Sequence, residues 1–374
     1  MSTGGWSRRL PLDGEGLFRE RDGEMNELRR WAAEEWWRGR GWESRRWWLQ
    51  PAGQAAWTAC AALGVGRLAW RQRLGWGEGA RLFRDCLRSG AQPAEAFQWR
   101  QKGCGTQLYP LPARAGGILF QHLGDLAEQR ILADKEAAAK ALSAIGIPIP
   151  QTAIVIRQGA ELDENAAVWQ EPAELFVKPR RGSGGLGSRA VSILGGGRYS
   201  WGSGEPENWE SFSKKLAAAV ALDDLLVQER ITASPEWRDL APEGRAPVIR
   251  LTTARERGGD AFLHSALLVV AVPGESPRNL LRGQVFYPVD LQRGEWGEER
   301  RIAGWTDAAA VGLAAMRLFP GLPLVTWDVI PGERRPVLLE GNTAANWFLT
   351  IIPERSGLAA PLEPLLARWA WGVR

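Results

Sequence analysis

The sequence is poor in cysteine and histidine, which narrows the chemistry open to it. Three cysteines and two histidines occur in 374 residues. Cys60, Cys86 and Cys104 are widely spaced, form no CxxC pair and have no histidine nearby, so neither a zinc site nor a disulfide framework is expected. His122 and His264 lie in apolar stretches, which favours packed core residues over catalytic bases. A cysteine or serine hydrolase is therefore poorly supported, and a reduced, cytoplasmic setting is the simpler interpretation.

Long hydrophobic runs are also scarce. The first sixteen residues, MSTGGWSRRLPLDGEG, contain no apolar core of the kind found in a secretory signal. Residues 47–66 carry no charge, but they include Pro51 and are rich in alanine and glycine, which is weakly apolar for a membrane span. We expect a buried helical hairpin there and no integral membrane segment.

A strong charge of one sign is missing as well. The formal net charge is +4, and 41 of the 47 basic residues are arginine. Acidic residues are interspersed with the basic ones nearly throughout, whereas a nucleic-acid protein is expected to concentrate its basic residues on one face or tail. A nucleic-acid partner is not expected.

What the chain does have is tryptophan, and 11 of its 21 tryptophans fall in residues 1–105, often beside arginine or glutamate. Apolar positions there recur near helical spacing. One interpretation is a helical layer of stacked Trp and Arg side chains that covers another domain. The other is a surface for an aromatic, saccharide, peptide or membrane-interface partner, and composition does not choose between them.

After residue 131 helices, turns and strands alternate in an order that fits two α+β lobes with a cleft between them. We expect a helical Trp/Arg-rich region over residues 1–105 and an α+β domain over residues 106–374. Within that domain we place a first subdomain at 106–170, a second at 171–235 and a C-terminal subdomain at 236–374.

A lysine followed by a glycine-rich turn is the first motif with chemical content. Lys178 ends a short apolar strand, where an ammonium group is costly unless it meets an anion. The turn that follows, Gly182-Ser-Gly-Gly-Leu-Gly187, allows backbone N–H groups to point at phosphate oxygens without interference from Cβ atoms. The lysine precedes the glycines, so the motif is not a Walker A loop. A plain flexible hairpin is the alternative.

Two further motifs lie in the C-terminal half. Asp328 and the Glu340-Gly341-Asn342 motif belong to consecutive strands, so two carboxylates could lie side by side, an arrangement that favours a cation such as magnesium between them. Arg250 alternates with Thr252 on another strand. Facing a cleft, it would be a fixed guanidinium for a phosphate or carboxylate, and the alternative is a structural ion pair with a nearby glutamate.

Taken in order, these motifs resemble the ATP-grasp superfamily, roughly over residues 106–355, and within it the sugar-transfer-associated group. The supporting segments are Ala133-Asp134-Lys135, Gly146-Ile-Pro148-Ile-Pro150, Phe176-Val-Lys178-Pro with its glycine loop, Val227-Gln228-Glu229, Ile249-Arg250, Trp327-Asp328-Val329 and Glu340-Gly341-Asn342. The resemblance implies an ATP-grasp fold, with the nucleotide held between two α+β lobes. It also implies that residues 171–235 form a lid subdomain and residues 236–374 a C-terminal metal-binding subdomain.

The resemblance also implies a role for individual residues. Lys178 would contact ATP phosphates, together with Lys135 or, in its place on the same helix, Lys140. Arg250 would face the transferred phosphoryl group, so that Arg250 and Lys178 are the catalytic candidates. The remaining implied sets are a phosphate loop of Gly182, Ser183, Gly184, Gly185 and Gly187, an adenine hinge of Gln228, Glu229 and Ile231, and ligands for two Mg²⁺ ions in Asp328, Glu340 and Asn342.

The implied activity is that of an ATP-dependent carboxylate–amine ligase. A substrate carboxylate would be activated as an acylphosphate and attacked by an amine, with release of ADP and phosphate. Alternatives are a phosphotransferase or an ester-forming ligase acting on a hydroxyl, and a non-catalytic binding module that uses the Trp/Arg-rich region. The partners would be a small-molecule or peptide carboxylate and an amine, and the oligomeric state stays open, with a homodimer among the options.

Overall fold

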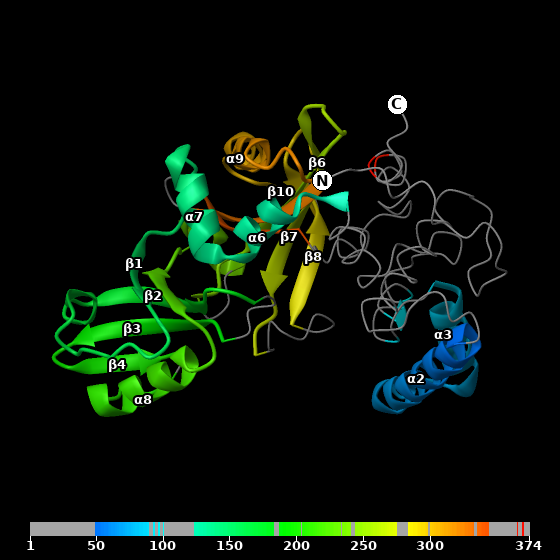
Figure 1. Cartoon of the computed structure of the whole chain (residues 1–374), viewed down its shortest axis with the longest axis horizontal. Helices are drawn as coiled ribbons and strands as arrows, with labels where there is room; N and C mark the ends of the chain where they lie inside the picture. Colours follow the sequence, from blue (N-terminus) through cyan, green and yellow to red (C-terminus); the bar gives the residue numbers. More distant parts are fainter. Residues whose placement is uncertain are drawn as a thin grey trace.

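Two five-stranded antiparallel sheets and a separate pair of helices make up the described part of the chain (Figure 1). The predicted α+β class with two lobes is confirmed, since each sheet has a hydrophobic core of its own. The computed structural model describes residues 49–89, 123–182, 187–202, 204–232, 234–240, 244–274, 283–297, 300–332 and 335–343, with residues 93, 96, 97, 100, 365 and 369 in addition.

The first lobe is a sheet with the strand order β1-β5-β2-β3-β4, covered on one face by α8 (Figure 1). Phe212 and Leu216 of α8 are fully buried against Val177, Val191 and other apolar residues of the sheet. The strands and helices are β1 (Thr152–Ile156), η1 (Ala167–Trp169), β2 (Ala173–Pro179), β3 (Arg189–Gly195), β4 (Arg198–Trp201), α8 (Trp209–Val220) and β5 (Leu225–Glu229).

Strand β1 precedes β2 in the chain, yet it pairs with β5 at the edge of this sheet. The first sheet therefore draws strands from both sides of the boundary that we place at residue 170. The boundary itself stays a prediction.

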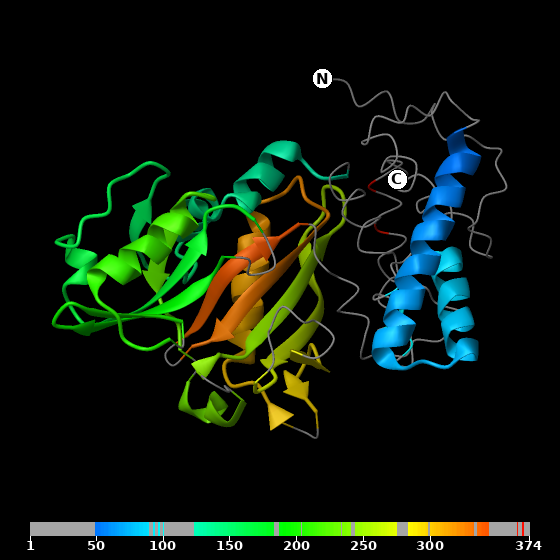
Figure 2. The same ribbon diagram turned by 90° about the horizontal axis from the view of Figure 1, so that it is seen from below.

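The second lobe is a sheet with the order β12-β11-β6-β7-β8, and α9 packs across one of its faces (Figure 2). Every residue of β11 is buried, and Trp327 at its centre is fully enclosed. The elements are η2 (Pro235–Leu240), β6 (Val248–Arg255), β7 (Ala261–Ala271), β8 (Gln284–Pro288), the two-stranded β9 (Glu295–Trp296) and β10 (Arg300–Arg301), α9 (Trp305–Arg317), β11 (Leu324–Pro331) and β12 (Pro336–Asn342).

Two short helices, α6 (Leu126–Ala133) and α7 (Lys135–Ala144), precede the first sheet in the chain and lie against β12 of the second. Asp134 separates them, because its carboxylate accepts hydrogen bonds from the backbone N–H groups of Glu136 and Ala137 and so caps α7. The helix ends before Gly146, whose φ of 78° is a left-handed conformation that favours glycine.

The described part of the N-terminal region consists of α2 (Leu49–Gln72) and α3 (Trp76–Ser89), which pack against each other (Figure 2). Its predicted helical character is confirmed. The predicted hairpin within residues 47–66 is wrong, because residues 49–66 belong to one helix and the turn comes at residues 73–75. Pro51 lies in the first turn of α2, where its missing N–H has no intrahelical partner to lose. Nor is the helix buried all round, since Leu63 is 76% exposed.

Candidate functional site

Lys178 stands where the two lobes meet. Its side chain leaves β2 of the first sheet and its ammonium Nζ donates a long hydrogen bond of 3.4 Å to the carbonyl oxygen of Leu339 on β12 of the second. Within the described residues this is the only hydrogen bond that the ammonium makes, although the residue is just 7% exposed. Burial lowers the pKa of Lys178 to about 8, although the carboxylates of Glu340 and Asp328 act in the opposite direction. A buried cation with so little compensation is suited to an anionic ligand.

Lys135 approaches the same region from α7. Its backbone N–H donates to the carbonyl of Arg180 at 3.0 Å, and its Nζ donates to the carbonyl of Gly182 at 2.7 Å. Lys140, the alternative on the same helix, instead donates to Glu136 at 2.9 Å and has a side chain that is 75% exposed. The structure therefore brings Lys135, and not Lys140, to the glycine segment.

The glycine segment is described at its two ends. Gly182 has a φ of 98° and Gly187 a φ of 77°, both in the region that favours glycine. A Cβ atom on Gly187 would also lie 2.8 Å from the ring of Pro179, too close without a shift of the proline. Ser183, Gly184 and Gly185 lie outside the described residues, so their predicted contact with phosphate stays a prediction.

Asp328 and Glu340 are direct neighbours across β11 and β12, as the sequence indicates. Asn342 follows on the same strand, and its amide Nδ2 donates to Glu340 Oε1 at 3.2 Å. Gly341 between them packs so closely on the indole of Trp327 that a Cβ atom would overlap the ring. The glycine of this motif is thus required by the packing that sets the two flanking side chains.

Arg250 faces Asp328 from the neighbouring strand β6. Its Nε and Nη2 atoms donate to the two carboxylate oxygens of Asp328 at 2.9 and 3.1 Å. The carboxylate of Asp328 has the largest effect on the Arg250 guanidinium and raises its pKa. Glu340 raises this pKa further, whereas burial of the guanidinium lowers it. The ion pair that we weigh as the alternative for Arg250 is therefore present, with an aspartate as partner.

The residues around Asp328 fit a magnesium ion only with help from other ligands. Among the described residues, no group of three or more histidine, cysteine, aspartate or glutamate side chains gathers at one point. Asp328, Glu340 and Asn342 offer two carboxylates and an amide oxygen, which suits Mg²⁺ because it is often held by one or two carboxylates, with water and substrate phosphates completing its shell. Both oxygens of Asp328 already accept bonds from Arg250, so Glu340 is the less committed ligand.

The predicted adenine hinge follows β5. Gln228 is 3% exposed and its side-chain amide donates to Thr152 Oγ1 at 3.0 Å, so its side chain is committed to the link between β5 and β1. The backbone N–H of Glu229 donates to the carbonyl of Gln151 at 2.9 Å. The backbone of Ile231 has no hydrogen bond to any described residue, which leaves it as the hinge candidate with free backbone groups.

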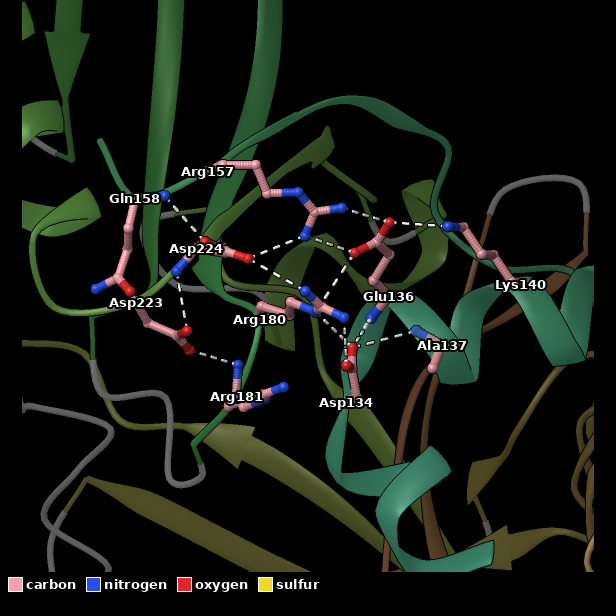
Figure 3. Close-up of polar contacts among 10 residues, drawn as sticks. All are labelled: Asp134, Glu136, Ala137, Lys140, Arg157, Gln158, Arg180, Arg181, Asp223 and Asp224. Atoms are coloured by element: carbon pink, nitrogen blue, oxygen red, sulfur yellow. Dashed lines mark hydrogen bonds and ion pairs between the residues drawn. The ribbon is translucent and has the colours of Figure 1, made fainter. Parts of the chain in front are cut away.

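A cluster of ion pairs beside Lys135 has no counterpart in the sequence prediction (Figure 3). Arg180, two residues after Lys178, donates to Asp134 at 2.9 Å and to Asp224 at 3.1 Å. Arg157 at the end of β1 donates to the same Asp224 at 2.9 Å and to Glu136 at 3.0 Å. The cluster thereby joins the first turn of α7 to the edge of the first sheet.

The pKa values of the cluster follow from these bonds. The backbone bond from Gln158 and the bonds from the two arginines hold the pKa of Asp224 at about 2. Burial alone would raise the pKa of Asp134, but bonds from Arg180 and from the α7 backbone outweigh it and lower the pKa below its usual value. Both acids are ionised at neutral pH. The arginine doublet in Lys178-Pro-Arg180-Arg181-Gly182 is the signal that could have pointed to the cluster.

The remaining histidine prediction agrees with the structure in part. Burial lowers the pKa of His264 to about 4, and its ring contacts Ser265 Oγ at 3.3 Å on β7. It is therefore neutral at physiological pH, as expected of a residue that is not a catalytic base, but it is half-buried on β7 and does not belong to the core. His122 and Cys104 lie outside the described residues, while Cys60 is exposed and Cys86 is buried.

Solved structures similar to this chain include two ligases and a biotin carboxylase domain. A D-alanine–D-alanine ligase from Bacillus anthracis, complexed with ATP, has a TM-score of 0.40 and 13% identity, over 64% of this chain and 62% of that one. The biotin carboxylase domain of 2-oxoglutarate carboxylase from Hydrogenobacter thermophilus, with MgADP and bicarbonate, has a TM-score of 0.44 and 16% identity, over 67% and 48%. A D-Ala:D-Ser ligase from Enterococcus faecalis has a TM-score of 0.41 and 16% identity, over 67% of this chain and 63% of that one. The chain thus spans less than two thirds of each.

Among curated proteins the sequence has no match. A family model described as sugar-transfer-associated ATP-grasp matches residues 119–304. This range includes Lys135, Lys178 and Arg250 but ends before Asp328 and Glu340, whose assignment depends on their place in the second sheet. The chain is therefore a member of the ATP-grasp superfamily, and residues 119–304 belong to its sugar-transfer-associated group.

Proposed function

We propose that the protein is an ATP-dependent ligase that activates a carboxylate as an acylphosphate for attack by an amine. The observation that carries the proposal is the junction at Lys178, where a buried ammonium from one sheet meets the strand of the other that bears Glu340. Lys135 and Arg250 add two further cations close to the same junction. Such a concentration of fixed positive charge beside two carboxylates suits Mg·ATP, which brings both phosphates and a cation.

The basic side chains would position and neutralise the triphosphate. Phosphoryl transfer depends on placement and electrostatic stabilisation more than on a protein nucleophile. Lys178 is held rigidly by β2 and would meet phosphate oxygens without prior loss of many water contacts. Lys135, now bonded to the Gly182 carbonyl, would turn to a phosphate at the entry of the glycine segment.

At the other end of the site, Arg250 and the acidic residues would have separate roles. Glu340, Asn342 and Asp328 would hold magnesium, which when bound supplies charge neutralisation of the phosphate oxygens. Arg250 keeps the Asp328 carboxylate in place through two hydrogen bonds and would direct its remaining N–H groups toward the incoming phosphoryl group or substrate carboxylate.

The reaction balances as two displacements. A substrate carboxylate oxygen forms a bond to the γ-phosphorus while the bond from that phosphorus to the bridging oxygen breaks, and ADP leaves. The amine nitrogen then bonds to the carbonyl carbon, the bond from that carbon to the phosphate oxygen breaks, and inorganic phosphate leaves. The amine gives up one proton to solvent.

A reaction at a hydroxyl is the second candidate, and the family description favours it. A sugar-transfer-associated domain would be expected to meet hydroxyl-rich substrates. The same nucleotide site would serve an ester-forming ligase or a phosphotransferase.

ADP release in the presence of pooled carboxylates and amines tests these possibilities. ADP and phosphate together with a condensed product, followed by mass, support the amide ligase. A stable phosphorylated product that needs no second substrate would assign the phosphotransferase instead, and an ester product the hydroxyl ligase. If titration of the purified chain detects no binding of ATP and magnesium, the site is not a nucleotide site and a binding module remains.

A further inference from the structure

The tip of the helical hairpin exposes two tryptophans that no part of the ATP site explains. Trp70 in the last turns of α2 is 81% exposed, and Trp76 at the start of α3 is 97% exposed. Leu63, seven residues before Trp70 and therefore on the same face of α2, is 76% exposed. Exposed apolar side chains that lie close together mark an interaction surface, whereas single ones occur on most soluble proteins.

Helix α2 is apolar on two opposite faces. Ala61 and Val65 on one face are buried, with 1% and 6% exposure. Leu63 and Trp70 stand on the other face, which is open in the structure. A helix that faces water on one side normally carries polar residues there, so the outer face of α2 is built for contact with something less polar than water.

The same tip is strongly basic. Arg67, Arg71 and Arg73 are exposed around the two tryptophans, and within the described residues none of the three forms an ion pair. Residues 49–89 contain six arginines and two acidic residues, a formal charge of +4, whereas the rest of the chain has 41 basic and 41 acidic residues. The net positive charge of the whole protein therefore resides in this hairpin.

We propose that the α2–α3 hairpin docks the protein on an anionic lipid surface. Tryptophan side chains favour the boundary between headgroups and acyl chains, and arginines between them can pair with lipid phosphates. The formal charge of +4 on residues 49–89 is complementary to such an anionic surface.

The hairpin lies on the membrane and does not cross it. Over the described residues, no helix is long and apolar enough to form a span, α2 included. In this arrangement the turn between the helices faces the membrane, and Trp70 and Trp76 enter the headgroup region. The arginines nearby stay at the level of the lipid phosphates.

Sedimentation of the full chain with vesicles tests the docking surface. The protein is expected to pellet with vesicles of phosphatidylcholine mixed with phosphatidylglycerol, to stay in solution with phosphatidylcholine alone, and to be released as salt is raised. Removal of one arginine, as in Arg67→Gln, Arg71→Gln or Arg73→Gln, is expected to weaken binding by about fivefold. The double variant Trp70→Ala/Trp76→Ala should weaken binding to the anionic vesicles at every salt concentration.

The matched control substitutions lie on the two α+β lobes and not on the hairpin. Leu222→Ser removes a side chain that is 83% exposed next to α8, and Arg257→Gln removes an exposed arginine between β6 and β7. Both should bind vesicles as the parent does. Circular dichroism confirms that each variant is folded. Failure of the parent chain to pellet with anionic vesicles at low salt, equal binding by the hairpin variants, or hairpin-dependent binding to RNA in place of vesicles would overturn the proposal.

Discussion

At the scale of single residues, we expect Lys178 to be required for ATP turnover although it lowers the free energy of unfolding. Its ammonium is buried with one long hydrogen bond, and a pKa of about 8 against 10.5 in water corresponds to about 3 kcal/mol of unfavourable burial at neutral pH. Lys178→Met should therefore abolish ATP turnover while raising the free energy of unfolding, by up to that amount. Urea unfolding and ADP release measure the two effects.

Lys140→Met is the matched control for this substitution. It removes an equally sized side chain from α7, but one that is exposed and paired with Glu136. Turnover should stay near that of the parent. A Lys178→Met protein that still releases ADP would contradict the site.

The affinity for ATP should depend on pH through Lys178. An anionic ligand favours the protonated lysine and raises its pKa, so binding takes up protons once pH exceeds the free-state value of about 8. Affinity should be fully present below that pH and should fall as pH rises through it. Calorimetric titration in buffers of different ionisation enthalpy measures the proton uptake, and an affinity that is flat from pH 7 to about 9.5 would count against the buried lysine as a phosphate ligand.

Arg250 and Asp328 should behave as a coupled pair. Arg250→Ala leaves the Asp328 carboxylate buried beside Glu340 without its counter-ion, and we expect a loss of about 3 kcal/mol in unfolding free energy. Turnover should fall strongly while ATP binding is largely kept. Because Mg²⁺ can replace the lost cation, magnesium should stabilise the variant more than it stabilises the parent in thermal melts.

The double variant Arg250→Ala/Asp328→Asn provides the control. It removes both charges, so most of the lost stability should return although turnover does not. If the double variant is as unstable as Arg250→Ala alone, packing and not charge explains the loss.

At the scale of elements, the sequence is a good guide to the individual strands and a poor one to their partners. The apolar run that ends at Lys178 and the two acidic strands are found close to their expected places. Local patterns specify strands because apolar alternation depends on neighbouring residues alone. The pairing of β1 with β5 depends on contacts about seventy residues apart, which leave no local pattern in either strand.

The partners within the ion-pair cluster could not be predicted for a related reason, although the arginine doublet marks one of its segments. Asp134, Arg157, Arg180 and Asp224 come from four separate segments, and the chain has 41 arginines among which composition does not choose. Arg250 is the intermediate case. Its strand and face follow from alternation, whereas its partner Asp328 follows only from the pairing of β6 with β11.

We predict that the ion-pair cluster affects ATP binding, although its side chains are not among those proposed to contact the phosphates. Arg180→Ala removes the bonds that tie Asp134 and Asp224 together, so the first turn of α7, which carries Lys135, loses one of its two arginine links to the first sheet. We expect KM for ATP to rise about tenfold with a smaller change in kcat, which corresponds to about 1.4 kcal/mol of uniform binding. Steady-state kinetics separate the two constants.

Two comparisons show whether position is the cause. Arg181→Ala removes the adjacent arginine, whose backbone N–H rather than its side chain bonds to Asp223, and should leave KM unchanged. Asp134→Asn keeps a side-chain oxygen that caps α7 but weakens the ion pair with Arg180, and should raise KM in the same direction as Arg180→Ala. Equal KM values for Arg180→Ala and the parent would show that the cluster is only structural.

At the scale of the whole molecule, ligand binding should couple the two lobes. Because the proposed site draws on both sheets, Mg·ATP should stabilise the entire α+β body, by about 2.7 kcal/mol at one hundred times its Kd. The melting temperature of the parent should rise by several degrees on addition of both ATP and magnesium. Glu340→Gln should melt like the parent without ligand and lose the part of the shift that requires magnesium.

ATP alone, magnesium alone and the Lys178→Met protein serve as controls for this melt. A shift of the same size in Lys178→Met would mean that ATP binds elsewhere. The hairpin should not contribute, so Trp70→Ala/Trp76→Ala is expected to show the same shift as the parent.

The position of β12 has a consequence for biosynthesis. It is the last described strand of the second sheet, yet α6 and α7 rest on it, Leu338 donates a backbone bond to Pro148, and Leu339 meets Lys178. A nascent chain that has not yet released residues 336–342 from the ribosome has both lysines but lacks the strand on which α7 rests and which Lys178 contacts. The site is thus completed only after all other described strands have been translated, and the second sheet must stay free of aggregation until β12 pairs with β11.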